Sequence, residues 1–327
     1  AGWPFGGTVK HGEAVRIFTG AKLPDGADAV AIQENVTRDG DNATLASPAK
    51  AGDNIRLRGI DFHEGDTVLT RGRVINARDI LFAAAAGHAM LAVVRRPLVA
   101  VLATGDELVE PSDRPADGQI VSSNPYGLAA LFENAGANVK LLGIALDDAE
   151  DLAVKLKDAE SADILVTVGG ASVGVHDLVR PALTQAGAAL HFHKIAMRPG
   201  MPVFFGTRQG LKGTQRIVGL AGNPVSAMIG GRIFVVPLIA ALLGRSQPPD
   251  MLKAQLTTPI AANGPRLHFM RAIVDVSHGT AGTVTPLPSQ DSSLVAALAA
   301  ANCLIVNPAD APRLEAGTLV DVMRLDF

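Results

Sequence analysis

Several acidic and basic side chains follow directly on apolar runs of the sequence, and these residues are best suited to chemistry. Asp106, Glu107 and Asp147 follow two such runs. Lys194 and Arg198 follow a third. Mg²⁺ binds one or two carboxylates together with phosphate oxygens, and cationic side chains bind the remaining phosphate charge. The set therefore predicts a site for a Mg²⁺–phosphate ligand. For any single carboxylate, a loop cap or a surface ion pair of little energetic weight remains an alternative.

A glycine-rich loop has the form of an anion cradle. The apolar, β-branched run Ile164–Val168 predicts a buried strand. The segment from Asp177 onward predicts a helix that ends at Gly187. Between them, Gly169–Gly174 lets the backbone approach a phosphate closely, and Ser172 adds a hydroxyl donor. A loop of this kind can also be only a tight turn.

Alternating strands and helices place these polar loops at one edge of a sheet. A long apolar helix is predicted at Pro224–Leu243, and strands are predicted at Leu98–Ala103, Val139–Leu146, Ile164–Val168, Ala189–Ile195 and Ile217–Leu220. The alternation is typical of a doubly wound, mostly parallel α/β sheet. Ligands of such sheets bind at the carboxyl ends of the strands. The polar loops, including His193–Pro199 and Gly222–Pro224, are therefore expected to meet there.

Two smaller β regions flank the α/β domain, which is predicted over residues 97–247. Residues 1–72 are predicted as a small β domain with strands at Ala29–Gln33 and Ala43–Leu45 and a turn at Asp39 and Gly40. Residues 73–96 are predicted as a helical linker, with the helix at Val74–Ala92. Residues 248–327 are predicted as a second small β domain, with strands at Leu252–Thr257, His268–Val276 and Gly282–Pro286.

Composition excludes several classes of function. The net charge is −3 and aromatic residues make up 4% of the chain, which argues against a nucleic-acid binder. Cys303 is the single cysteine, so no disulfide forms within the chain. The apolar run Ile233–Leu243 is short for a membrane span and contains Pro237. No signal peptide is visible. We therefore expect a cytoplasmic protein that binds neither nucleic acid nor membrane.

Seven segments in a fixed order resemble those of a known family, the molybdopterin molybdenumtransferases of molybdenum cofactor synthesis. The segments are RIFTGAKLPDGADAV (16–30), NIRLRGID (54–61), ATGDEL (103–108), GQIVSSN (118–124), GGASVGVHD (169–177), KIAMRPGMPVFFG (194–206) and GLAGNPVSA (219–227). Each segment alone is modestly specific, but their number and order are highly specific. The resemblance covers nearly the whole chain.

The resemblance implies an α/β molybdopterin-binding domain between a small N-terminal β domain and a C-terminal β-barrel-like domain. It implies Mg²⁺ as a cofactor, adenylylated molybdopterin and molybdate as small-molecule substrates, and release of AMP as molybdenum joins the dithiolene. The family forms homodimers, with the active site between the α/β domain of one subunit and the β region of the other. Transient contacts with the adenylyltransferase and with apo-molybdoenzymes are also expected.

Candidate site residues are carried over from the family by its motifs, with Arg271 and Ser292 as looser matches in the C-terminal domain. Catalytic roles are expected for Asp61, Glu107, Asp147, Lys194 and Arg198, with Mg²⁺ on Glu107 and Asp147. The residues expected to bind the substrates are Thr19, Thr104, Gly105, Asp106, Gly169, Gly170, Ser172, Gly174, Asp177, Pro199, Gly222, Asn223, Pro224, Ser226, Arg271 and Ser292.

The chain departs from the family pattern at several positions. Val168 and Ser122 replace a hydroxyl residue and an aspartate, Ala221 replaces a proline, and Arg198 stands where lysine is common. The family's N-terminal segment with an Asp-Gly-Tyr-Ala motif is not in the sequence, so the first β domain is expected to be incomplete.

Two other hypotheses remain open at this point. One is a molybdopterin adenylyltransferase, which shares the α/β domain and the glycine loop; the segment TGAKLPDGADAV (19–30) argues against it. The other is a non-catalytic pterin-binding or scaffold relative. Retention of Asp61, Glu107 and Asp147 argues against that alternative.

Overall fold

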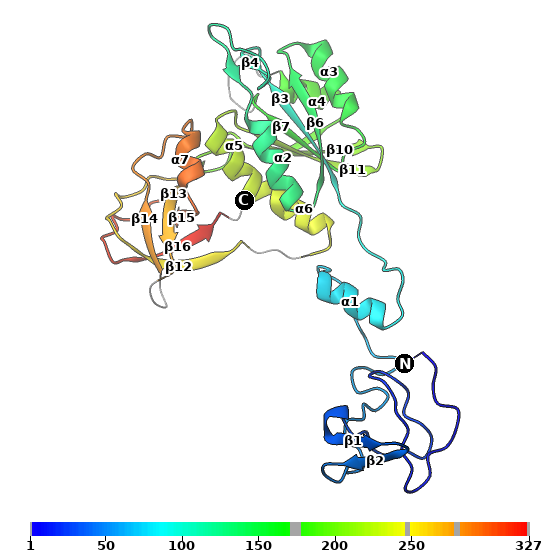
Figure 1. Ribbon diagram of the computed structural model, residues 1–327. Coiled ribbons are helices and arrows are strands. Elements are labelled where there is room, and N and C mark those ends of the chain that lie inside the picture. Colours follow the sequence, from blue (N-terminus) through cyan, green and yellow to red (C-terminus); the bar gives the residue numbers. More distant parts are fainter. Residues whose placement is uncertain (1, 171–177, 246–248, 278–281, 326–327) are drawn as a thin grey trace. The chain divides into compact units, whose positions relative to one another are not determined.

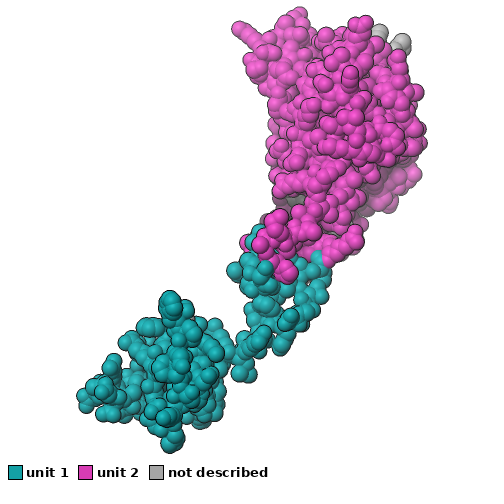
Figure 2. All heavy atoms as spheres, turned by 90° about the vertical axis from the view of Figure 1, so that its right-hand side faces the viewer, with its two compact units in different colours: residues 1–70, 78–87 teal, residues 71–77, 88–327 magenta. Residues whose placement is uncertain are grey.

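The computed structural model describes residues 2–170, 178–245, 249–277 and 282–325 (Figure 1). The chain folds as two compact units (Figure 2). Unit 1 comprises residues 1–70 and 78–87, and unit 2 comprises residues 71–77 and 88–327. Ser172, Gly174 and Asp177 lie outside the described residues.

Unit 1 holds little regular structure. A 3-10 turn η1 (Gln33–Asn35) leads into the hairpin β1 (Val36–Asp39) and β2 (Asn42–Leu45). The predicted turn is confirmed, with Gly40 at φ 57°. The predicted strand at Ala29–Gln33 is wrong. The backbone N–H of Val30 donates to the carbonyl of Asp53, and the carbonyl of Val30 accepts from the Asn54 side chain, so loop contacts replace strand pairing.

Helix α1 (Ala77–Ala85) is shorter than the predicted Val74–Ala92. Gly87 adopts φ 83°, and its N–H donates to the carbonyl of Ala84, which ends the helix. The alanine-rich composition indicated helix correctly, but it did not mark this glycine as the stop. Phe82 on α1 packs edge-on against Phe62, with ring centroids 5.3 Å apart.

A six-stranded sheet forms the core of the α/β part of unit 2. Its strand order is β6-β3-β7-β11-β10-β8. The strands β6 (Asn138–Ala145), β3 (Leu98–Thr104), β7 (Ile164–Val168) and β11 (Gly213–Leu220) are parallel. The other two strands, β10 (Phe204–Gly210) and β8 (Ala189–His193), complete the sheet. The mostly parallel sheet is confirmed.

Strand β10 was not predicted. It forms an antiparallel hairpin with β11 in which Gly210 pairs with Gly213, at φ 102°, across the turn residues 211 and 212, and it separates β8 from β11. Its sequence, FFGTRQG, continues a glycine- and proline-containing segment, and the apolar pattern therefore gave no clear strand boundary.

Helices cover both faces of the sheet (Figure 1). Alternate residues of β3 enter two cores: Val99 and Val101 pack on one side, and Ala100 and Leu102 on the other. The first core includes residues of α2 (Asn124–Asn134), α5 (Pro224–Gly230) and α6 (Val236–Leu242). The second includes residues of α3 (Ala149–Asp158) and α4 (Val179–Gln185).

One continuous helical stretch, Pro224–Leu242, is long and apolar enough to cross a membrane, but 61% of its most apolar part is buried inside the protein. It consists of α5, a π-helical turn at Gly231–Val235 and α6. Pro237 cannot donate a helical hydrogen bond, and the π turn directly before it absorbs the disruption. The predicted long helix packing into the core is therefore confirmed.

The C-terminal part of unit 2 is a closed barrel. Its strands are β12 (Met251–Leu256), β13 (Leu267–Asp275), β14 (Gly282–Pro286), β15 (Cys303–Asn307) and β16 (Leu319–Arg324). The ring closes because β13 pairs with β14 as well as with β15. Helix α7 (Val295–Ala300) precedes β15. The short strand β9 (Met197–Arg198) leaves the α/β part and pairs in parallel with β13.

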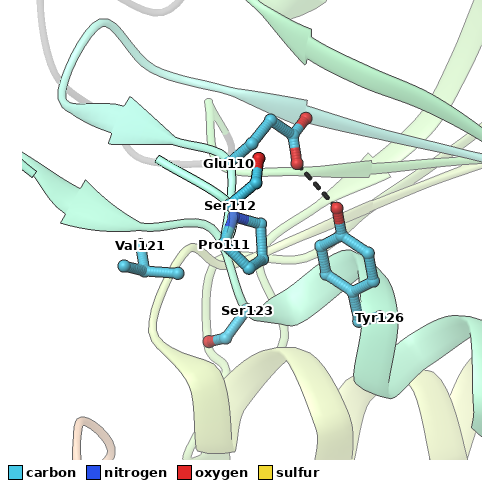
Figure 3. A pocket seen from close by; sticks show the side chains of 6 residues that line it. All are labelled: Glu110, Pro111, Ser112, Val121, Ser123 and Tyr126. Carbon is cyan, nitrogen blue, oxygen red and sulfur yellow. Dashed lines mark hydrogen bonds between the residues drawn. The ribbon is translucent and has the colours of Figure 1, made fainter. Parts of the chain in front are cut away.

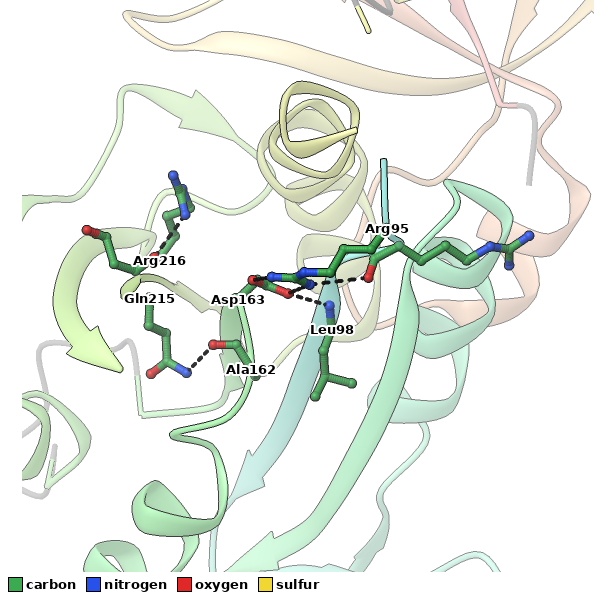
Figure 4. Close-up of polar contacts among 8 residues, drawn as sticks. Arg95, Leu98, Ala162, Asp163, Gln215 and Arg216 are labelled. Carbon is green, nitrogen blue, oxygen red and sulfur yellow. Dashed lines mark hydrogen bonds and ion pairs between the residues drawn. The ribbon is translucent and has the colours of Figure 1, made fainter. Parts of the chain in front are cut away.

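An ion pair fastens the segment that precedes the sheet. The two terminal guanidinium nitrogens of Arg95, Nη1 and Nη2, donate to the carboxylate of Asp163 at 2.7 and 2.6 Å, and the N–H of Leu98 donates to the same carboxylate at 2.8 Å (Figure 4). These donors, Arg95 first, hold the pKa of Asp163 below its usual range, although burial opposes them.

Replacement of Asp163 with asparagine is expected to lower the free energy of unfolding by about 1–3 kcal/mol, because a buried carboxylate loses its charge-assisted hydrogen bonds. A carboxyl with a lowered folded-state pKa stabilises the fold above its unfolded pKa, about 3.9, and this contribution disappears as pH falls through the folded value. Urea unfolding from pH 7 down to pH 3 checks both points. Equal acid sensitivity in D163N and wild type would contradict them.

Candidate functional site

A pair of glycines follows the carboxyl end of β7 and contacts the carboxyl end of β3. Gly169 and Gly170 adopt φ 95° and 61°. A Cβ on Gly169 would lie 2.5 Å from the carbonyl oxygen of Thr104, and one on Gly170 would overlap Cγ2 of Val179. Neither position has room for a side chain, and both have backbone conformations that glycine adopts most readily. At these two residues the backbone therefore approaches the end of β3 closely, which is what the predicted cradle requires.

Thr104 contributes a buried hydroxyl to this cradle. The residue is 5% exposed, and its Oγ1 lies 2.9 and 3.2 Å from the Cβ positions built on Gly169 and Gly170. No hydrogen-bond partner for this oxygen is found among the described residues. A buried hydroxyl without a partner carries a desolvation cost that a bound ligand atom can remove.

The two acidic loops are tied together. The N–H of Gly105 donates to the carbonyl of Ala145 at 3.2 Å, and the N–H of Asp147 donates to Oδ1 of Asp106 at 2.9 Å. Gly105 adopts φ 144°, and the carboxylate of Glu107 folds back over it, 2.5–2.9 Å from the Cβ position built there. Asp106 thus joins the loops that carry the two predicted Mg²⁺ ligands.

The described residues contain no group of three or more His, Cys, Asp or Glu side chains placed to hold a metal ion by themselves. Glu107 and Asp147 are both exposed and come from the two tied loops. Such a pair fits Mg²⁺, because this ion usually takes only one or two protein carboxylates and completes its shell with water and substrate phosphate oxygens.

The segment Gly222–Pro224 lies at the same edge, after β11. A Cβ on Gly222 would lie 3.8 Å from Cα of Gly169, and the side-chain amide of Asn124 donates to the Gly222 carbonyl at 2.6 Å. Asn223 is the N-cap residue of α5, and Pro224 occupies its first turn. The Asn124 amide thus connects α2 to the segment beside the cradle.

Ser292 of the C-terminal barrel region contacts the start of α5. The Asn223 amide donates to Oγ of Ser292 at 2.9 Å, and the N–H of Val225 donates to the Ser292 carbonyl at 3.1 Å. The backbone carbonyl of Ser292 thus satisfies one of the free N–H groups at a helix start. The predicted candidate Ser292 is therefore close to Asn223.

Arg271 is 1% exposed and lies beneath the same loop. Its guanidinium donates to the carbonyls of Ser289 and Leu294, at 3.2 and 3.4 Å, and burial lowers its pKa. Its backbone also exchanges hydrogen bonds with the Gln290 side chain. In this conformation Arg271 holds the loop that carries Ser292, a role that the sequence did not indicate.

The predicted cations lie on the segment between β8 and β10. Lys194 follows β8 with φ 72°, and its N–H donates to the Val203 carbonyl at 2.8 Å. Both Lys194 and Arg198 are exposed. Further along, the Cβ position of Gly200 lies 3.4 Å from the carbonyl of Ser226 in α5. The segment therefore passes the start of α5, and Pro199 lies between the two contacts.

Arg198 pairs in register with His268 of β13. His268 is 6% exposed. Burial, together with the charges of Arg198, Arg266 and Arg271, lowers the pKa of His268 to about 4. The imidazole is therefore neutral at pH 7, so the positive charge around Arg198 comes from the arginines alone. A lone histidine in a strand gave no signal of this environment in the sequence.

The remaining two candidates belong to unit 1. Thr19 lies on an exposed turn, closed by a hydrogen bond from the N–H of Ala21 to the Phe18 carbonyl at 2.9 Å. Asp61 is exposed and follows a second turn, which is closed by a hydrogen bond from the N–H of Ile60 to the Leu57 carbonyl at 3.2 Å.

All three parts of the chain match known family descriptions. Residues 1–87 match the MoeA N-terminal region (domains I and II), residues 100–241 match the probable molybdopterin binding domain, and residues 253–325 match the MoeA C-terminal region (domain IV).

Curated relatives and a solved structure agree with these matches. Identity is 36% over 313 residues with the molybdopterin molybdenumtransferase of Staphylococcus aureus (strain Mu50 / ATCC 700699), covering 95% of this chain and 74% of the relative. The Staphylococcus epidermidis enzyme (strain ATCC 12228 / FDA PCI 1200) is 33% identical over 318 residues, covering 97% and 75%. The crystal structure of the molybdopterin biosynthesis MoeA protein from Pyrococcus horikosii superposes with a TM-score of 0.82 at 28% identity, covering 99% of this chain and 78% of that one.

A glycine cradle at the carboxyl edge of a doubly wound sheet, joined to a closed barrel, is the architecture of a MoeA-like molybdopterin-binding protein. The sequence identities with the curated relatives narrow this class of proteins to one family. The chain belongs to the molybdopterin molybdenumtransferase family, and the resemblance drawn from its motifs is confirmed.

Proposed function

We propose that this chain transfers molybdenum from molybdate to adenylylated molybdopterin, with Mg²⁺-dependent release of AMP. The observation that carries the proposal is the meeting of Thr104, Gly169 and Gly222 at the ends of three neighbouring parallel strands. The acidic loops join this edge through β3 and β6. The printed names of the relatives, molybdopterin molybdenumtransferase, support the same reaction.

The residues present fit the charge of both substrates. Molybdate is an oxyanion, and Lys194, Arg198 and the Ser292 hydroxyl are suitable donors for it. The cradle and the Thr104 hydroxyl suit a phosphate. Glu107 and Asp147 would hold Mg²⁺, which supplies Lewis-acid polarisation of the phosphate linkage when bound. In this scheme the chain itself contributes positioning and preorganised charge, and no covalent nucleophile is needed.

We further propose a homodimer in which unit 1 supplies Thr19 and Asp61 to the site of the other copy. Large apolar side chains of unit 1 are exposed, among them Phe18 at 65% and Ile60 at 70%, the immediate neighbours of the two candidates. Exposed apolar patches of this kind mark interaction surfaces in proteins. A second copy of the chain is the occupant that this proposal requires.

Sedimentation equilibrium is expected to give twice the chain mass of 33.8 kDa. Leu57, 74% exposed in unit 1, is expected to lie in the dimer contact, so Leu57→Asp should shift the equilibrium toward monomer. Leu211→Asp is the matched control, since Leu211 is 75% exposed on the turn between β10 and β11. A monomeric wild type, or an equal effect of both variants, would contradict the proposal.

Two assays distinguish the transferase from the related adenylyltransferase. The transferase consumes adenylylated molybdopterin and molybdate and releases AMP, whereas the adenylyltransferase consumes ATP and molybdopterin and releases pyrophosphate. We expect activity only in the first assay. Pyrophosphate release in the second would reject the proposal, and binding without turnover in either would point to a non-catalytic relative. A cytoplasmic location and transient contacts with the adenylyltransferase and with apo-molybdoenzymes complete the proposal.

A further inference from the structure

An open hollow of ≈ 630 Å³ lies beside the acidic loop that follows β3 (Figure 3). Its volume falls within the range of small-molecule sites, and it is open to solvent on one side. It is lined by residues of two short parallel strands and their neighbours, β4 (Leu108–Val109) and β5 (Ile120–Val121), and by the start of α2. The lining residues are Glu110, Pro111, Ser112, Val121, Ser123 and Tyr126.

Both walls of the hollow continue directly into the candidate site. On one side, the N–H of Ile120 donates to the carbonyl of Glu107 at 2.8 Å. On the other, Ser123 precedes Asn124, whose amide bonds the Gly222 carbonyl at the cradle. A ligand whose phosphate occupied the cradle would therefore have the hollow next to it, within the same set of loops.

The polar end of the hollow is a carboxylate. The hydroxyl of Tyr126 donates to Oε2 of Glu110 at 2.6 Å, and this hydrogen bond raises the pKa of Tyr126 (Figure 3). An ionised carboxylate has two oxygens and about four lone-pair positions and accepts only. Glu110 thus keeps acceptor capacity for a ligand after it has bound Tyr126, while Tyr126 fixes the position of the carboxylate.

Apart from the side chains of Ser112 and Ser123, the rest of the hollow is lined by apolar groups and one aromatic ring. Figure 3 shows the Tyr126 ring opposite Pro111 and Val121, with Ser123 below them. Flat heteroaromatic ligands stack on aromatic side chains with little dependence on their identity. The ring therefore favours a flat ligand. The carboxylate selects among flat ligands for one whose edge donates hydrogen bonds.

We infer that this hollow binds the pterin ring of the substrate and that Glu110 recognises its 2-amino and ring N–H groups. That edge presents two adjacent donors to an acceptor-only carboxylate. The edge of adenine instead presents one amino donor beside ring acceptors, which an ionised carboxylate repels. The inference rests on the proposed function, because it takes molybdopterin as the substrate, and it assigns Glu110 and Tyr126 as binding residues that the family motifs did not indicate.

The test measures ring binding separately from turnover. Quenching of 6-hydroxymethylpterin fluorescence reports pterin binding to the full chain, and calorimetry reports AMP binding. Glu110→Gln is expected to weaken pterin binding about tenfold or more, because the new amide donor faces a ligand donor. AMP binding should remain unchanged. Glu133→Gln, an exposed position on α2, is the matched control, and Tyr126→Phe keeps the ring and should keep most of the affinity.

Three outcomes of the binding measurements overturn the inference: no saturable pterin binding by wild type, equal pterin binding by E110Q and wild type, or loss of AMP binding in E110Q. The last would assign the hollow to the adenine ring. Failure of the transferase assay with pterin binding intact would reject the proposed function and leave the subsite. An unchanged KM for adenylylated molybdopterin in an active E110Q would reject the subsite and leave the function.

Discussion

Replacement of Glu107 with glutamine is expected to lower molybdate-dependent AMP release by at least ~100-fold, the scale on which one preorganised charge in an active site acts. Glutamine keeps the size of the side chain, but it removes the negative charge that would hold Mg²⁺ next to the substrate phosphates. The Glu107 carboxylate folds over Gly105 within the loop that is bonded to the Asp147 segment. The fold should therefore remain intact while turnover falls.

The control for this variant is Glu150→Gln. Glu150 is exposed in the first turn of α3, three residues after Asp147, and it carries the same charge. Its replacement tests whether the general negative charge of the region matters, and near-normal turnover is expected. Raising the Mg²⁺ concentration should partly restore E107Q if the lost interaction is metal binding. Turnover of E107Q close to that of wild type would remove Glu107 from the site.

Replacement of Gly169 with alanine is expected to weaken substrate binding more than tenfold and to destabilise the fold by about 1–3 kcal/mol. The new Cβ would stand 2.5 Å from the carbonyl oxygen of Thr104, and the backbone φ of 95° is unfavourable for alanine. Relief of the overlap requires the ends of β3 and β7 to separate, which opens the cradle. Equilibrium binding of AMP, which carries a phosphate that the cradle can bind, measures the first effect. Urea unfolding measures the second.

Gly187→Ala is the matched control for the glycine variant. Gly187 adopts φ 82°, close to that of Gly169, but a Cβ there would meet nothing within 4 Å. The control therefore carries the backbone strain without the overlap. The difference in AMP affinity between the two variants then measures the effect of the overlap at the cradle. Equal substrate affinity in G169A and G187A would show that the close approach of the two strand ends has no part in binding.

Local patterns predicted the central strands of the α/β domain well, because these strands are buried on both faces. The runs Leu98–Ala103 and Ile164–Val168 could bury their side chains only inside a two-sided sheet, and both are central strands. The run Ala29–Gln33 had similar β propensity, but in the structure the backbone of Val30 forms hydrogen bonds with a distant loop instead of with a strand. Hydrogen-bond partners distant in sequence decided that case, and periodicity contains no information about them.

The candidate site was predictable as a set of loops and not as a set of contacts. Strand ends placed Thr104, Gly169 and Gly222 at one edge, and the structure brings them together. The burial of Arg271 against two carbonyls was not predictable, since its resemblance to a family site residue says nothing of its exposure. The pairing of Glu110 with Tyr126 was also missed, because it depends on how two short strands align across an intervening loop.

The central claim is that this chain couples AMP release to molybdenum insertion. The most direct test is a single turnover of purified protein with adenylylated molybdopterin and Mg²⁺, in which AMP released and molybdenum incorporated are counted with and without molybdate. The account predicts equal amounts of both products with molybdate and little AMP without it. AMP release that is independent of molybdate, or bound substrate that is never converted, would contradict the account.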